Sequence, residues 1–586
     1  MFEREKSILE DRIIQVLNNQ NIEPSEFKWT WIPFSGQWGL STSLFATAAS
    51  NPGIHPDFSV GKRAALIADS IKKELQLPEK FYKLESVRGY LNFFFDTNDY
   101  AARIIESVLS SGNCYGMGEK TGKKIMVEFS QPNTHKAFHV GHLRNMVLGS
   151  SVCRILEFAG NDVVRANYIG DIGLHVIKWL WNYMNFHLGE VPPEDKKTKW
   201  MGDIYAEAVN RIEGNPEFEK EIRELFLRWD RKEAEIVALW EKTRKWSMDA
   251  FHEVYEMLNI HFDRFYFESD VDEPGKEIVC ELIKKGLAVD ERPEGAVIVD
   301  LDKLIGTEDT YRVLVMLRSD GTSLYPTKDI PLAIMKFEEY DMDQSIYVID
   351  VRQSLYMKQI FRLLDLMGYD WSEKCYHLAY EIVNLPGNVT IASREGTVVL
   401  LEDLIWEAKR RAQLIVEEKN PGLDEIVNRR IARKVALGAI KYSLLSKDNT
   451  KIITFDWDSA MDVNGQAAPY IQYAYVRANS IIKKFGDALP TASVPEYELT
   501  EAEIELIDLL ARFPQEIQRA AKDLRPLLIA NYSYDAAKAF SNFYNKCPVL
   551  TAEKNIRDFR LKMVNAFKQV IENSLDVLGI EVPEVM

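Results

Sequence analysis

A short apolar segment, a histidine-rich loop and a helical pattern follow one another between residues 125 and 168, and this order constrains the fold most. Residues 125–129 read Ile-Met-Val-Glu-Phe, and apolar residues then recur at helical spacing from Leu143 until Gly160. Residues 162–168 read as a second strand. Strand, helix and strand in this order predict a β-α-β unit, and therefore an α/β domain with a parallel sheet.

The loop between the first strand and the helix holds three of the nine histidines, at positions 135, 139 and 142. A helix N-terminus offers free N–H groups and partial positive charge, which suit a polyphosphate. His139 and His142 add donors, and Gly141 lets a base or sugar approach the backbone. The alternative is that such histidines only cap a helix in a well-packed domain. That reading suits one isolated histidine, whereas the cluster favours a nucleotide site.

The tetrapeptide His139-Val-Gly-His142 resembles the "HIGH" signature of class I aminoacyl-tRNA synthetases. The HxGH pattern alone is shared with small nucleotidylyltransferases. The flanking segments 130–136, 143–145 and 167–173 resemble arginyl-tRNA synthetases in particular. The resemblance implies an arginine-tRNA ligase, which forms arginyl-adenylate from L-arginine and ATP and transfers the arginyl group to the terminal ribose of tRNA(Arg). In that family activation typically requires bound tRNA, and we expect the same here.

The resemblance also implies three domains over nearly the whole chain. Residues 1–115 would form an α+β domain that binds the D-loop side of the tRNA elbow, with helices at 3–17 and 62–74 and a strand at 89–95. A class I, Rossmann-type catalytic domain with a parallel sheet would span 116–400 and carry a helical insertion at about 180–272. Long charged helices such as 216–258 are expected in that insertion, and strands at 295–300 and 345–350. Residues 401–586 would form an all-α anticodon-binding domain.

An arginine side chain needs carboxylates and planar acceptors in fixed geometry. If Pro326 begins a helix, Tyr325 and Asp329 lie four residues apart and can face one pocket. Pro331 stands where a better helix former is expected, which leaves the geometry after Asp329 open. The resemblance places five residues around arginine, the first three at its side chain and the last two near its α-amino and carboxylate groups: Glu128, Tyr325, Asp329, Asn133 and Gln353.

The second class I signature departs from its usual form. The resemblance aligns it with residues 390–396, Thr-Ile-Ala-Ser-Arg-Glu-Gly, in which both usual lysines are replaced. Many arginyl enzymes share this loss, and a lysine before the first signature is then thought to act on the phosphates. Lys136 stands at that place. We therefore predict Lys136, His139 and His142 as catalytic residues, and Lys136, His139, Gly141, His142, Ser393 and Arg394 as the ATP-binding set.

Because the net charge of the chain is −17, we expect any contacts with tRNA phosphates to lie in local basic regions of the surface. Basic stretches occur at 409–411, 429–430 and 433–434, and each is also compatible with an ordinary solvated helix face. The resemblance points to Tyr90 and Asn92 for the tRNA elbow. For the anticodon it points to Tyr470, Tyr473 and Arg477, while helical tyrosines, Tyr475 included, are also common in cores.

The five cysteines form no CxxC pair and lack histidines at zinc-ligand spacing, which predicts free thiols and no protein-bound structural metal. Mg²⁺ is expected to arrive with ATP. The sequence holds no run of eighteen uncharged apolar residues, and its first residues are charged. We expect a cytoplasmic monomer without a membrane partner.

Two rival functions remain at this point. A nucleotidylyltransferase that uses no RNA has no need of a helical region beyond residue 407. A catalytically inactive RNA-binding paralogue should have lost Asn133, His139, Gly141 or His142, and all four are present.

Overall fold

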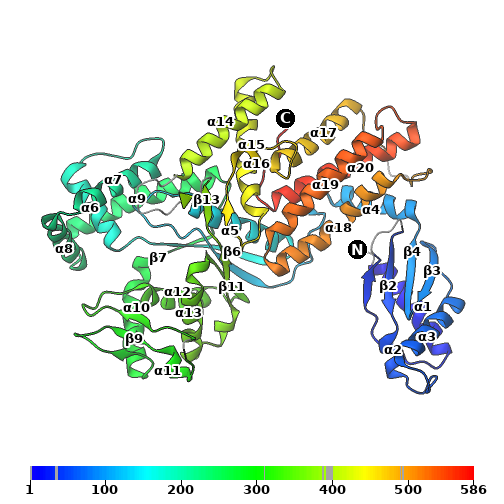
Figure 1. The fold of residues 1–586 in the computed structure, drawn as a ribbon, viewed down its shortest axis with the longest axis horizontal. Helices are drawn as coiled ribbons and strands as arrows, with labels where there is room; N and C mark the ends of the chain where they lie inside the picture. Colours follow the sequence, from blue (N-terminus) through cyan, green and yellow to red (C-terminus); the bar gives the residue numbers. More distant parts are fainter. Residues whose placement is uncertain are drawn as a thin grey trace. The chain divides into compact units, whose positions relative to one another are not determined.

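The computed structural model describes residues 3–32, 37–308, 310–385, 389–390, 400–488, 490 and 494–586 (Figure 1). The chain forms two compact units. One comprises residues 1–115, 477–513 and 535–571, and the other comprises residues 116–476, 514–534 and 572–586. The predicted three-domain division, at 115 and 400, stays a prediction.

The larger unit is built around a five-stranded, all-parallel sheet with the strand order β12-β11-β5-β6-β7. Helix α5 joins β5 to β6, and Gly160, with φ of 101°, follows its last turn. The predicted β-α-β unit and the parallel α/β fold are therefore confirmed. The bounds are β5 Lys124–Glu128, α5 Val140–Phe158, β6 Asp162–Ile169, β7 Arg264–Phe267, β11 Gln344–Asp350 and β12 Cys375–Tyr380.

Four helices fill the connection from β6 to β7 and gather in one cluster (Figure 1). They are α6 Leu174–Phe186, α7 Lys197–Ile212, α8 Pro216–Asp230 and α9 Ala234–Met257. The prediction of a continuous helix over 216–258 was wrong. The chain turns at Lys232, whose φ is 56°, so that α8 and α9 fold back and bury apolar faces in one shared core, with Leu225 from α8 and Trp240 from α9.

A small antiparallel sheet and its helices separate β7 from β11. Its strand order is β10-β9-β8, and its core includes Val297 and Met316. Strand β9 lies within the predicted 295–300, and β11 matches the predicted 345–350. The bounds are α10 Glu268–Lys284, β8 Val289–Asp290, β9 Val297–Val299, α11 Leu301–Ile305, β10 Leu314–Leu317, α12 Tyr325–Glu339 and, after β11, α13 Ser354–Leu366.

Beyond β12 the described residues are mostly helical, as the sequence predicted. Short strands β13 Val383–Leu385, β14 Val389–Thr390 and β15 Ile453–Thr454 form a further sheet. The helices are α14 Leu401–Lys419, α15 Glu425–Leu445, α16 Trp457–Ala460, α17 Ala468–Phe485, α18 Glu501–Asp523, α19 Pro526–Lys546 and α20 Lys554–Asp576.

The other unit contains an antiparallel sheet with the order β1-β2-β4-β3. Phe93 and Phe95 on β4 are fully buried, so these aromatic residues belong to the core. The bounds are α1 Glu3–Asn19, β1 Trp29–Trp31, β2 Gly39–Ser43, α2 Phe45–Ser50, α3 Val60–Glu74, β3 Phe81–Val87, β4 Tyr90–Phe95 and α4 Thr97–Ser111.

Candidate active site at the carboxyl end of the parallel sheet

A cavity of about 430 Å³ lies at the carboxyl end of the parallel sheet. Strands β5, β6 and β11 each contribute residues from their last positions or from the loops that follow. Open α/β sheets bind ligands at this edge, and the volume suits a small-molecule ligand. Eight of the residues predicted to bind ATP or arginine line the cavity: Glu128, Asn133, His139, Gly141, His142, Tyr325, Asp329 and Gln353.

The loop between β5 and α5 adopts an unusual backbone. Ser130, Gln131 and His135 all have positive φ, at 79°, 43° and 62°. Such residues need support from the surrounding structure. Two asparagines provide it, because the side-chain oxygen of Asn145 accepts a hydrogen bond from the Ser130 N–H and that of Asn167 accepts one from the Gln131 N–H. These contacts hold the loop that carries the site.

His139 and His142 cap the first turn of α5 through their Nδ1 atoms. The Gly141 N–H donates to Nδ1 of His139 at 3.1 Å, and the His139 N–H donates to Nδ1 of His142 at 3.2 Å. Burial lowers the pKa of His139 to about 4 and that of His142 well below its ordinary value, with a further lowering from the Lys136 charge. Both rings are therefore neutral near pH 7. Since each Nδ1 accepts a hydrogen bond, each Nε2 carries the proton and remains a donor.

Two glycines allow close approaches in the site. A Cβ on Gly141 would lie 2.8 Å from the His139 ring, so the side chain that this glycine accommodates is the adjacent imidazole. A Cβ on Gly170 would lie 2.2 Å from the side-chain oxygen of Asn133, which pairs with Gly170 as an isolated bridge. Substitution of either glycine would displace a residue that lines the cavity.

The end of the cavity near α12 carries the acidic residues. Helix α12 begins at Tyr325 and continues through Pro331, so Tyr325 and Asp329 share one face, as their spacing predicted. Tyr325 is 65% exposed at the mouth, whereas burial raises the pKa of Asp329 to about 7. The hydroxyl of Tyr356 donates a hydrogen bond to Asp329. Glu128 is buried and forms an ion pair with Lys336.

The remaining predicted ATP-binding residues lie elsewhere. Lys136 is absent from the cavity lining, and its Nζ lies 5.0 Å from the centre of the Tyr205 ring. Burial and the Lys178 charge lower the pKa of Lys136. Ser393 and Arg394 fall outside the described residues. The phosphate roles of these three residues stay predictions.

Arg144 is a residue of the site to which sequence reasoning gave no role. Its guanidinium lines the cavity and donates hydrogen bonds to five backbone carbonyls, those of Glu381, Ile382, Asp448, Asn449 and Lys451. It thereby joins the start of β13 to the turn before β15. Its place two residues after the His-Val-Gly-His tetrapeptide was the available signal, together with Asn145.

Comparison with known proteins assigns the chain to a family. Residues 104–457 match the model described as tRNA synthetases class I (R), catalytic domain, and residues 471–586 match the DALR anticodon binding domain. Arginine--tRNA ligase of Alkaliphilus metalliredigens is 34% identical over 529 residues, which cover 90% of this chain and 91% of that protein. The chain belongs to the arginyl-tRNA synthetase family.

Further relatives agree with this membership. Arginine--tRNA ligase of Bdellovibrio bacteriovorus is 35% identical over 507 residues, 85% of this chain and 86% of that protein. The solved arginyl-tRNA synthetase of Thermus thermophilus superposes with a TM-score of 0.77 at 29% identity, and the whole of each chain is covered. The class I fold, the synthetase activity and the helical anticodon domain expected from the sequence are therefore confirmed.

Two further properties concern only the part of the chain that the structure describes. In that part, no three histidine, cysteine, aspartate or glutamate side chains lie together as a metal site would need. Within the same residues, every helix is too short or too polar to cross a membrane. All five cysteines are free thiols, as predicted.

The residues predicted for the tRNA elbow lie on β4 of the smaller unit. Tyr90 is 44% exposed, and its ring packs edge-on against Phe45 with 5.4 Å between centroids. Asn92 accepts a hydrogen bond of 2.6 Å from the hydroxyl of Ser41. Tyr90 thus keeps an exposed side chain, while Asn92 is held by its neighbouring strand, and the tRNA roles of both residues stay predictions.

The residues predicted for the anticodon lie on α17. Tyr473 is 36% exposed, whereas the ring of Tyr470 lies 5.5 Å from that of Tyr534. The guanidinium of Arg477 lies 4.7 Å from the centre of the Tyr544 ring. Tyr475 is 7% exposed, and its hydroxyl donates to Glu572, so it packs in the interior. The tRNA roles of Tyr470, Tyr473 and Arg477 stay predictions.

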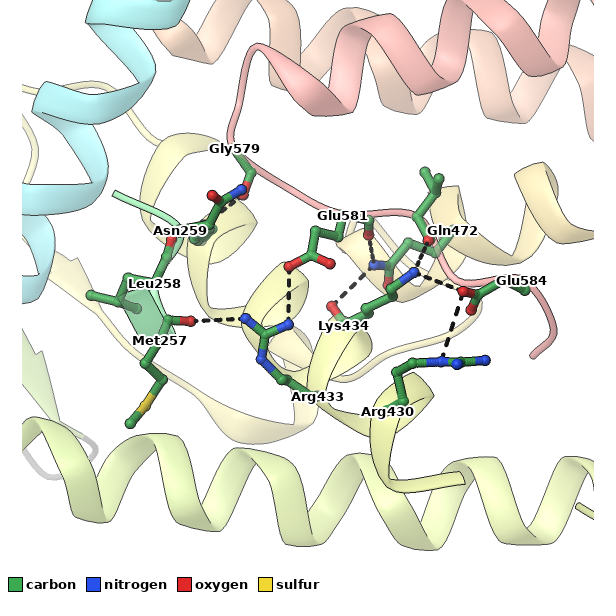
Figure 2. Close-up of polar contacts among 12 residues, drawn as sticks. Met257, Leu258, Asn259, Arg430, Arg433, Lys434, Gln472, Gly579, Glu581 and Glu584 are labelled. Atoms are coloured by element: carbon green, nitrogen blue, oxygen red, sulfur yellow. Dashed lines mark hydrogen bonds and ion pairs between the residues drawn. The ribbon is translucent and has the colours of Figure 1, made fainter. Parts of the chain in front are cut away.

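Most of the basic side chains in the stretches singled out in the sequence are paired with carboxylates. Figure 2 shows Arg430, Arg433 and Lys434 of α15 facing the segment after α20, where Glu581 and Glu584 accept their hydrogen bonds and ion pairs. Arg410 and Arg411 pair with Glu407 on their own helix. Much of this positive charge is thus neutralised within the protein, and the charges of α15 fasten the C-terminal segment.

Proposed function

We propose that this chain joins L-arginine to tRNA(Arg) through arginyl-adenylate, and that the cavity at the carboxyl end of the sheet is where activation occurs. The observation that supports this most directly is that the cavity carries two chemically different sets of lining groups. Neutral imidazole donors and a helix N-terminus lie at one part of the lining, and carboxylates lie at another. The part with the imidazoles and the helix N-terminus suits phosphate oxygens, and the part with the carboxylates suits a guanidinium.

At the acidic end, Asp329 and Glu128 accept from the guanidinium of arginine, and the Tyr325 ring covers it at the mouth. Asn133 and Gln353 lie nearer the α-amino and carboxylate groups. This assignment places the reacting carboxylate toward the histidines. The support is that all five residues line one cavity, although they come from segments as far apart as 128 and 353.

At the phosphate end, the carboxylate oxygen of arginine attacks the α-phosphorus of ATP in line. A carboxylate–phosphorus bond forms, and the bond between that phosphorus and the pyrophosphate oxygen breaks. His139 and His142 donate from Nε2 to phosphate oxygens, and Lys136, Ser393 and Arg394 share the phosphate charge. Mg²⁺ arrives with ATP. Donors that are already oriented stabilise the charge that develops as pyrophosphate leaves.

In the second step, a terminal ribose hydroxyl of tRNA attacks the carbonyl carbon of the adenylate, and AMP leaves. Tyr90 and Asn92 contact the elbow, and Tyr470, Tyr473 and Arg477 contact the anticodon stem-loop. The ligase works as a cytoplasmic monomer, and activation depends on bound tRNA.

Pyrophosphate exchange into ATP tests the proposal. Arginine should support exchange when tRNA is present and much less when tRNA is absent, while lysine and citrulline should not support it. Exchange that is independent of arginine would contradict the assignment of the cavity. Equal exchange with and without tRNA would contradict only the tRNA dependence.

A further inference from the structure

Three carboxylates gather around the acidic end of the cavity. Glu128 ends β5, Glu268 begins α10 and Asp329 lies in the second turn of α12, and all three line the cavity. Glu128 and Glu268 are 2% and 7% exposed. Carboxylates in such a place need compensating positive charge or a proton.

Two of the three carboxylates have a lysine as partner. Lys336 forms an ion pair with Glu128, and Lys328 Nζ lies 2.8 Å from a carboxylate oxygen of Glu268. Lys336 is fully buried and Lys328 is 8% exposed. Neither lysine lines the cavity, so both ammonium groups reach their carboxylates from the protein side. On the cavity side, the other oxygen of Glu128 accepts a hydrogen bond of 3.0 Å from the side chain of Gln131, which also lines the cavity.

Asp329 is different, because no described lysine or arginine forms an ion pair with it. It accepts a hydrogen bond from the hydroxyl of Tyr356, a neutral donor. The other charged groups of the lining are already engaged, since Arg352 pairs with Asp350 at 2.8 Å and Arg144 donates to backbone carbonyls.

A buried hydroxyl points to a ligand at the same place. Tyr168 of β6 lines the cavity, and within the described part of the chain its hydroxyl has no hydrogen-bond partner. Burial raises the pKa of Tyr168, and the charges of Asp329, Glu268 and Glu128, which line the same cavity, raise it further. An unsatisfied polar group in such surroundings suits a ligand with several N–H donors.

We propose that Lys328 and Lys336 determine the specificity for an amino acid with one side-chain cation, because they neutralise two of the three carboxylates. Asp329 alone then lacks a cationic partner before the substrate binds, and its carboxyl group releases a proton when the guanidinium enters. This inference rests on the proposed function, in which arginine binds at Asp329. Two ammonium groups and one guanidinium then balance three carboxylates. The O–H bond of the Asp329 carboxyl breaks, the proton passes to solvent, and the guanidinium binds intact.

The surroundings of Asp329 agree with a carboxyl that holds a proton near neutrality. Burial raises its pKa to about 7, and the charges of Glu128 and Glu268 raise it further, while the Tyr356 hydrogen bond and the Lys336 charge oppose them. The other ionisable groups that sense its charge are the phenols Tyr168, Tyr325 and Tyr347, which stay neutral at that pH.

Calorimetric titration of the full chain with arginine tests the proposal. In two buffers of different ionisation enthalpy, the number of released protons should be about 0.9 at pH 6 and about 0.1 at pH 8 for one group with a pKa near 7. As the pH rises toward 7, the Kd for arginine should fall by about tenfold per pH unit, and above pH 7 it should become constant. Citrulline carries the same α-amino and carboxylate groups and no side-chain charge, so its binding should release no such proton.

Variants test whether the released proton comes from Asp329. Tyr356→Phe and Lys336→Met both remove a group that favours ionised Asp329, so the pH midpoint of arginine binding should rise in each. Lys358→Met, the same substitution on an exposed residue of α13, is the matched control and should leave the midpoint unchanged. In Asp329→Asn the proton release should vanish along with most of the affinity.

The outcomes distinguish a failure of the proton-release proposal from a failure of the proposed arginine position. Arginine binding that depends on Asp329 but shows no proton release and a constant Kd from pH 6 to 8 would overturn this inference alone. Proton release with unmoved midpoints in Tyr356→Phe and Lys336→Met would also overturn it. Unchanged arginine affinity in Asp329→Asn would instead overturn the proposed position of arginine, and with it both proposals.

Discussion

Substitution of His139 separates its two functions, the cap of α5 and the proposed donor to phosphate. In His139→Asn the side-chain oxygen can still accept the Gly141 N–H, because asparagine is among the best N-cap residues. The shorter side chain has no donor at the Nε2 position. His139→Ala loses both groups. The pair of variants therefore differs mainly in the cap.

The magnitudes follow from these contacts. Loss of one oriented transition-state donor typically lowers the rate by about 10² to 10³-fold, or about 2.7 to 4 kcal/mol. Loss of the cap costs about 1 kcal/mol of folding free energy. We expect the rate of arginine activation to fall by this factor in both variants. Only His139→Ala should also lose the folding free energy that the cap contributes. Single-turnover adenylate formation with tRNA measures the first quantity, and thermal unfolding measures the second.

The pH dependence gives an independent check. Folded His139 has a pKa of about 4, below the ordinary value of 6.5. The unfolded chain therefore takes up a proton that the folded chain does not, and the free energy of unfolding should fall as the pH drops from about 6.5 to about 4. His139→Asn should lose that part of the dependence. Near-normal activation by His139→Asn, or a stability loss equal to that of His139→Ala, would refute the reasoning.

Three further predictions test other parts of the site. Asp329→Asn should weaken arginine by about 2 to 5 kcal/mol and ATP far less, because a charge-assisted pair is lost; equal weakening of both substrates would indicate a damaged fold. Lys136→Ala should slow single-turnover activation without changing tRNA affinity, and Ser393→Lys in that background should restore part of the rate; an unaltered rate in Lys136→Ala would remove Lys136 from the mechanism. Arg144→Lys keeps the charge but supplies fewer donors to five carbonyls, so thermal unfolding should show a loss of about 2 to 4 kcal/mol; wild-type stability would show that the carbonyls find other donors.

Much of the fold followed from local patterns in the sequence. The apolar run at 125–129, the helical spacing after Leu143 and the stop at Gly160 predicted β5 and α5 nearly to the residue. The helix over 216–258 was wrong, because charged residues at helical spacing continue through the turn at Lys232. A residue in the left-handed region leaves little trace in such a pattern when it is not glycine.

The candidate site divides in the same way. Its residues were found from the His-Val-Gly-His tetrapeptide and from the Tyr325–Asp329 spacing, which are short-range signals. The support for those residues was not found, since Lys336 and Glu128 stand 208 positions apart and Lys328 and Glu268 stand 60 apart. Asn145 and Asn167 were quoted within motifs, yet their contacts with the loop after β5 depend on the folded backbone.

The sequence by itself determined the order of strands and helices in the catalytic unit, the chemical types of the site residues and the family to which they point. These properties depend on periodicity and on neighbours along the chain, which the sequence contains in full. The tertiary structure decided which groups carry charge. His139 and His142 are neutral donors and Asp329 titrates near pH 7 because burial and distant charges set the free energy of ionisation, and both depend on contacts between segments that are far apart in the sequence.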